Sequence, residues 1–186
     1  NPAGLDIRSV SVAVGPVGNA RPEAVSVSVD EMIYHTRAVR NGAGNSMVVT
    51  TLPFGSYETT EHAVKTAVRL VKEGKADAVH FEGTSAQCAG VKAIVDAGIP
   101  VLGHIGIIKQ KIVRTGAFQI QGRTADSAQQ ILADVVAFSN AGAFGLILEC
   151  IPARLGEIIT QSLEIPTIGI GAGANCDGQA LLTQDM

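Results

Sequence analysis

The feature that most constrains the fold is a unit that recurs along the chain: a short apolar run bounded by glycine or proline, followed by a helical pattern. Most of the runs are continuously apolar, which is typical of strands buried on both faces of a parallel sheet. The predicted strands are Val10–Val14, Met47–Leu52, Ala78–Phe81, Pro100–Leu102, Phe144–Leu148, Pro166–Ile170 and Ala180–Leu182.

Amphipathic helices are predicted between these runs. Ser28 followed by Glu31 forms a capping-box pattern at the start of DEMIYHTRAV. Thr60 is the predicted cap of the next helix, which ends at Gly74. Further helices are predicted over about 85–98, over about 124–142 with Ile131, Leu132, Val135 and Val136 buried, and in ARLGEIITQSL. Strands that alternate with helices of this length predict an α/β fold.

Two α/β architectures fit this alternation: an open, doubly wound sheet and a (β/α)8 barrel. GIGAG (169–173) begins like a dinucleotide-binding fingerprint, but no third glycine follows at the required offset. Polar residues instead collect at the ends of successive strands, where barrels carry their chemistry: His80, Glu82, His104 and Glu149. The pattern therefore favours a barrel.

Composition narrows the classes of partner. Hydrophobic residues make up 46% of the 186 residues, charged residues 17%, and the formal net charge is −3. This balance argues against nucleic acid or an anionic membrane surface as a partner. No apolar run reaches the length of a membrane span and the N-terminus does not resemble a signal peptide, so we expect a cytoplasmic protein, or a mitochondrial-matrix one in a eukaryote. Cys88, Cys150 and Cys176 are too few and too scattered for a disulfide framework.

Three of the strand-end residues suggest a metal-assisted enolisation site. Glu82 offers a hard oxygen donor for Mg²⁺. His104 is a candidate hydrogen-bond donor to a carbonyl or carboxylate, and Glu149 is a candidate general base. Structural roles stay open for each of them: a rim carboxylate, a satisfied histidine and an ion-paired glutamate.

Several motifs together resemble the ketopantoate hydroxymethyltransferase family. They occur in the family's order and spacing from about Val27 to the end of the chain. The motifs are DEMIYHTRAV, LPFGSY, GHIG, QIQGRTADSA, LILECIPARL and IPTIGIGAGANCDGQ.

The resemblance implies a (β/α)8 TIM barrel of the phosphoenolpyruvate mutase/isocitrate lyase superfamily, usually assembled as a decamer. It implies transfer of a one-carbon unit from 5,10-methylenetetrahydrofolate to 3-methyl-2-oxobutanoate with Mg²⁺ bound, in pantothenate biosynthesis. By resemblance Glu149 matches the base, Glu82 the acidic residue of the magnesium site, and His104 a substrate contact. We expect residues 1–186 to form one partial barrel domain that lacks the first strand and the C-terminal segment.

The sequence departs from the family pattern at the metal site. Pro16 and Val17 stand where the family has a metal-ligand Asp and a substrate-contacting Ser, and Thr51 replaces a second metal-ligand Asp. His80 replaces a substrate-binding Lys. Because Mg²⁺ requires hard oxygen ligands, we expect a weakened magnesium site, with His80 and Thr51 as substrate contacts.

These departures leave three functional hypotheses open. The chain is an enzyme of the family reaction, or a metal-independent enzyme acting on another 2-oxo acid, or a catalytically impaired or non-catalytic paralogue that keeps the barrel and its oligomer interface. The first is favoured, because Glu82 and Glu149 are retained.

Overall fold

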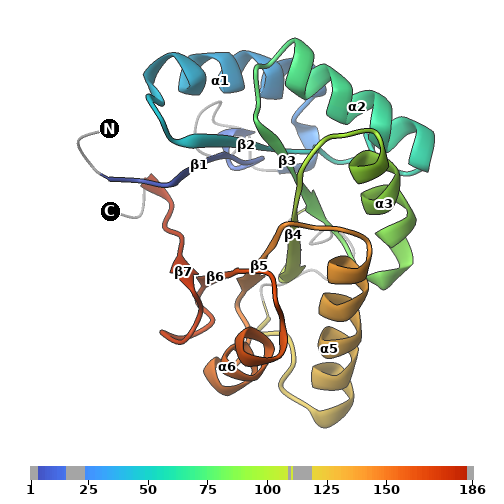
Figure 1. Cartoon of the computed structure of the whole chain (residues 1–186), viewed down its shortest axis with the longest axis vertical. Coiled ribbons are helices and arrows are strands. Elements are labelled where there is room, and N and C mark those ends of the chain that lie inside the picture. Colours follow the sequence, from blue (N-terminus) through green and yellow to red (C-terminus); the bar gives the residue numbers. More distant parts are fainter. Residues whose placement is uncertain (1–3, 16–23, 109, 111–118, 184–186) are drawn as a thin grey trace.

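A computed structural model describes residues 4–15, 24–108, 110 and 119–183. Its strands form one curled sheet with the helices on the outside (Figure 1). The strands are β1 (Ile7–Val10), β2 (Met47–Thr51), β3 (Ala78–Glu82), β4 (Val101–Gly106), β5 (Gly145–Glu149), β6 (Thr167–Ile170) and β7 (Gly178–Gln179).

The seven strands lie side by side in chain order, and every neighbouring pair is parallel. A doubly wound sheet reverses its strand order at a switch point. The described sheet has no such reversal, so the helices all return on one side and the sheet curls as part of a barrel.

Five α-helices cover the outer face in the described part of the chain (Figure 1). Two short 3₁₀ turns accompany them, η2 (Ala24–Ser26) and η3 (Ser85–Gln87). The helices are α1 (Val29–Gly42), α2 (Thr60–Lys72), α3 (Cys88–Asp96), α5 (Ala125–Asn140) and α6 (Ala153–Ser162). Among the residues described, no helix has both the length and the apolar character needed to cross a bilayer.

The helix starts follow the predicted capping chemistry closely. At α1 the Ser28 hydroxyl accepts the Glu31 N–H, and the Glu31 carboxylate accepts the Ser28 N–H at 2.8 Å, which confirms the capping box. Thr124, near which the fourth helix was predicted to start, is the cap of α5. The cap of α2 is Thr59 and not Thr60, because the Thr59 hydroxyl is the one that accepts a helix N–H.

The predicted burial of α5 is only partly correct. Ile131 and Val135 are buried as predicted and share one helical face with the buried Phe138, whereas Leu132 is only partly buried. Val136 is 49% exposed, because it lies on the opposite side of the helix from that face.

Three of the seven predicted strands differ from the observed ones by more than one residue at an end. The first strand is Ile7–Val10 and not Val10–Val14, because Ser11 starts a turn in which its hydroxyl accepts the Ala13 N–H at 3.2 Å. The last strand is Gly178–Gln179 and not Ala180–Leu182. These two residues are not apolar, and they form a strand because they pair with β6. β4 runs through Gly106, so His104 lies inside a strand and not at its end.

The sheet separates two apolar clusters. The larger lies between the sheet and the helices. The smaller lines the inner, concave face and consists of one buried residue from each of four successive strands: Val49, Ala78, Leu102 and Ile147. We call these four residues the apolar floor, because the candidate site residues follow them by two positions on the same face of the sheet.

Gly106 allows β4 and β5 to approach each other beside the polar layer. Its φ of +106° disfavours any L side chain, and a Cβ there would overlap the carbonyl oxygen of Glu149. Gly98 also has a positive φ, +84°, but a Cβ there would meet no other atom within 4 Å.

We therefore expect Gly106→Ala to lower the free energy of unfolding by about 3 kcal/mol or more, because strain and overlap add. Gly98→Ala carries the strain alone and should cost about 1 kcal/mol. Urea denaturation of the two variants measures the difference. Equal losses would contradict the close approach at Gly106.

Candidate active site and metal centre

A layer of polar side chains lies directly above the apolar floor. Successive residues of a strand point to opposite faces, so the residue two positions after each floor residue points to the same concave face. Those four residues are Thr51, His80, His104 and Glu149, and each is buried, with exposed fractions between 0% and 4%. The structure thus brings together in one layer four of the five sequence-predicted site residues, and the fifth is Glu82.

Hydrogen bonds join this layer into one chain. The Thr51 hydroxyl lies 2.7 Å from His80 Nδ1, and His80 Nε2 lies 2.9 Å from His104 Nδ1. His104 Nε2 lies 2.8 Å from the carbonyl oxygen of Ile107 and 3.2 Å from Glu149 Oε2. The two imidazole rings also stack, with centroids 5.0 Å apart.

The partners of His104 fix where its protons lie. A carbonyl oxygen only accepts, so His104 Nε2 carries a hydrogen that it donates to Ile107 and toward Glu149. One further proton is then shared between His104 Nδ1 and His80 Nε2. We call His80 Nδ1 and His104 Nε2 the outer nitrogens and His80 Nε2 and His104 Nδ1 the inner nitrogens. Each outer nitrogen has a protein partner, and the two inner nitrogens face one another.

Two effects act in opposite directions on the pKa of His104. Burial disfavours the charged imidazolium, whereas the hydrogen bond to Glu149 and the negative charge of Glu82 favour it. Burial is the largest single effect, but the effects that favour the charged form together outweigh it, and the pKa of His104 lies above its usual value. Glu149 thus has a hydrogen-bond donor beside it that is readily charged.

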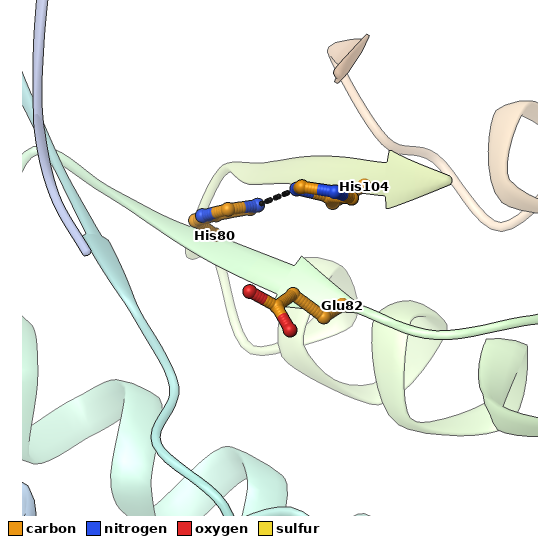
Figure 2. A group of neighbouring side chains, drawn as sticks. All are labelled: His80, Glu82 and His104. Carbon is orange, nitrogen blue, oxygen red and sulfur yellow. Dashed lines mark hydrogen bonds between the residues drawn. The ribbon is translucent and has the colours of Figure 1, made fainter. Parts of the chain in front are cut away.

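Glu82 lies one further layer along β3, on the same face as His80. It is the register partner of His104 across β3 and β4 and is 3% exposed. Figure 2 shows its carboxylate beside the two rings. One ligand atom from each of His80, Glu82 and His104 lies within 4.8 Å of the others, which makes these three a candidate metal-binding group.

This donor set does not fit Mg²⁺ well. Mg²⁺ requires near-octahedral oxygen coordination, whereas two of the three donors are imidazole nitrogens. The Thr51 hydroxyl is engaged with His80. Pro16, the residue at the family's Asp position, and Val17 beside it lie outside the described residues.

The main chain holds Glu149 from both sides. Ile107 N–H donates to its carbonyl oxygen at 3.0 Å, and the following residue, Cys150, donates to Ile170 at 2.8 Å. Gln121 N–H in turn donates to the carbonyl of Cys150 at 3.0 Å. The position of the carboxylate is thus set by three neighbouring segments.

Tyr57 is a neighbour of the site that the residue-by-residue prediction did not assign. Burial, followed by the negative charge of Glu82, raises the pKa of the Tyr57 hydroxyl well above its usual value, so it stays protonated. The hydroxyl lies 3.4 Å from Gln110 Oε1, and Gln110 Nε2 donates to Leu52 at 3.0 Å. The sequence does contain a signal for Tyr57, because this residue ends the LPFGSY motif that contributes to the family resemblance.

Among the residues that the structure describes, Cys88, Cys150 and Cys176 form no disulfide with one another.

Comparison with known proteins identifies the relatives of this chain. A family model described as ketopantoate hydroxymethyltransferase matches residues 1–186. A curated 3-methyl-2-oxobutanoate hydroxymethyltransferase of Clostridium botulinum (strain Alaska E43 / Type E3) is 45% identical over 99% of this chain and 67% of its own length. The enzyme of the same name from Heliobacterium modesticaldum is 47% identical over 98% of this chain and 66% of its own. The chain spans about two thirds of the length of these relatives.

Solved structures match the fold at low sequence identity. 2,3-Dimethylmalate lyase, a PEP mutase/isocitrate lyase superfamily member, aligns with a TM-score of 0.64 at 14% identity, covering 90% of this chain and 59% of that one. Oxaloacetate acetylhydrolase aligns with a TM-score of 0.65 at 10% identity, covering 90% and 60%. These matches confirm the predicted α/β barrel as the fold class.

The hydrogen bond from Thr51 to His80 can be tested against a matched bond on the same strand. Thr51→Val removes a partner of His80 inside the buried layer and should cost about 1–3 kcal/mol of unfolding free energy. Thr50 is equally buried but bonds to Thr36, whose hydroxyl also donates to Met32, so Thr50→Val should cost about 1 kcal/mol or less. Urea denaturation compares the two, and a larger loss for Thr50→Val would contradict the proposed hydrogen-bonded chain.

Proposed function

Because the chain belongs to the ketopantoate hydroxymethyltransferase family, we propose that it transfers a hydroxymethyl group from 5,10-methylenetetrahydrofolate to 3-methyl-2-oxobutanoate. The product is 2-dehydropantoate, a precursor in pantothenate biosynthesis. The observation that carries the proposal is the Glu149 carboxylate, which is 4% exposed and lies 3.2 Å from the His104 N–H in the polar layer.

Glu149 acts as the general base in this proposal. It removes the proton from the carbon next to the keto group, and the resulting enolate carbon bonds to the methylene carbon of the folate. That carbon leaves its two folate nitrogens, and water supplies the hydroxyl oxygen.

The two histidines and Thr51 act as substrate contacts. Without an ion at the rings, the shared proton supplies one N–H between them, and a bound carboxylate or keto oxygen can accept it. Thr51 holds the ring of His80 in place through its outer nitrogen. His104 orients Glu149 through its own outer nitrogen.

A divalent cation would stabilise the negative charge of the enolate, and the family resemblance implies Mg²⁺. Glu82 is the described carboxylate of the group that could hold it. Because the remaining donors are nitrogens, no step proposed above depends on Mg²⁺.

The base function of Glu149 can be measured without folate. We expect the chain to exchange the C3 proton of 3-methyl-2-oxobutanoate for deuterium in D₂O, followed by proton NMR with a divalent cation supplied. Glu149→Gln is isosteric but not basic, and should slow the exchange by about 10²–10⁴-fold.

Glu157→Gln is the matched control, because Glu157 lies on α6 in a surface ion pair with Arg154. It should leave the exchange rate unchanged. A folded wild-type chain that exchanges no faster than Glu149→Gln would contradict the proposed function.

We also infer a cytoplasmic homo-oligomer, on the family resemblance. Sedimentation velocity should give a species with about ten times the mass of one chain. A monomer at micromolar concentration would contradict the decamer.

A further inference from the structure

We propose that His80, Glu82 and His104 form a binding site for a late first-row transition-metal cation, of the zinc and cobalt class, in preference to Mg²⁺. The three side chains come from two adjacent strands, β3 and β4, and all are buried (Figure 2). Their ligand atoms lie within 4.8 Å of one another. This inference does not rest on the proposed function, because it is tested by measuring metal binding and not by measuring catalytic activity.

The distance between the rings matches a shared metal. His80 Nε2 and His104 Nδ1 are 2.9 Å apart and face each other. With a metal–nitrogen bond of about 2.0–2.1 Å, two nitrogens on one ion are about 2.9 Å apart at a right angle and about 3.3 Å apart in a tetrahedron. An ion that lies to one side of the line between the two nitrogens can therefore bind both, if the nitrogens shift by a few tenths of an ångström and the rings turn toward it.

The outer nitrogens are already arranged as they are in metal sites. A histidine that binds a metal almost always donates its other N–H to a carboxylate, a carbonyl or another oxygen, which fixes the tautomer and the ring. His104 does this with Ile107 and Glu149, and His80 has the Thr51 hydroxyl at 2.7 Å. Neither ring has to flip to present its inner nitrogen to an ion.

The carboxylates supply the negative charge that a dication requires. Glu82 completes the ligand set, because one of its carboxylate oxygens lies within 4.8 Å of one nitrogen of each histidine. Glu149 lies beside His104 and adds a second negative charge. Three protein ligands leave at least one coordination position for water or a small acid.

The chemistry of the donors selects the class of ion. Imidazole nitrogen suits zinc, cobalt, nickel and iron, whereas magnesium prefers carboxylate, carbonyl and water oxygens. Two imidazoles with one carboxylate therefore favour a transition metal. This preference follows directly from His80, which places a nitrogen where a carboxylate or hydroxyl would favour magnesium.

Cobalt(II) is the probe, because its visible absorption reports ligand type and number. We expect the purified chain, in excess Mg²⁺, to develop visible bands that saturate at one Co²⁺ per chain. The intense near-ultraviolet band of thiolate coordination should be missing, which excludes Cys88, Cys150 and Cys176 as ligands. Bands that Mg²⁺ at equal concentration abolishes, or a strong thiolate band, would overturn the proposal.

Variants locate the site. His80→Gln and Glu82→Gln should weaken Co²⁺ binding at least tenfold, and Thr51→Val about 10–100-fold because it frees the outer nitrogen of His80. His62→Gln is the matched control, because His62 pairs with Glu58 at the surface and offers the same residue types outside the site. Full binding by His80→Gln, or its loss in His62→Gln, would overturn the proposal.

The readouts separate this inference from the proposed function. Circular dichroism melting checks that each variant is folded, and if a variant does not fold, the competition between Co²⁺ and Mg²⁺ on the wild-type chain still decides. Failure of Co²⁺ binding with normal proton exchange overturns the metal site alone. Co²⁺ binding without exchange overturns the hydroxymethyl transfer alone.

Discussion

The parallel register of β2 to β5 is the constraint on which the rest of the structure depends. Because side chains alternate between faces, one register places Val49, Ala78, Leu102 and Ile147 on the concave face and the residue two positions later in each strand directly above. A slip of one residue in any of these strands would turn its polar side chain toward the helices. The apolar floor therefore also determines the geometry of the site.

The two departures from the family pattern on β2 and β3 are neighbours in space. Thr51 and His80 are register partners, and their side chains bond at 2.7 Å. By the family resemblance an aspartate and a lysine are expected at these positions, so one negative and one positive charge would be replaced together by a hydroxyl and an imidazole. The exchange leaves the formal charge of the pair unchanged while it changes the available donor atoms from oxygen and ammonium to hydroxyl and imidazole. This gives a physical reason for the two replacements to occur together.

The sequence was sufficient for the fold class and for the membership of the polar layer, because both follow from local periodicity and from motifs. The sequence was insufficient where contacts between segments that are distant along the chain decide the structure. Gly178 and Gln179 have no apolar signal, and they form a strand because β6 offers them partners. His80 was predicted as a substrate contact, whereas its place in a metal-binding group depends on the 2.9 Å approach of His104 from another strand. Tyr57 likewise becomes a neighbour of Glu82 only through the tertiary structure.

The anchoring of Glu149 by its backbone has a consequence for how such a protein can diverge. Since main-chain hydrogen bonds to Ile107, Ile170 and Gln121 hold this segment, the backbone of Glu149 keeps its location without help from the surrounding side chains. Neighbouring positions are then free to accumulate replacements that alter which ion or small acid is preferred. A lineage can in this way explore new specificities by exchanging side chains around a carboxylate whose backbone stays in place.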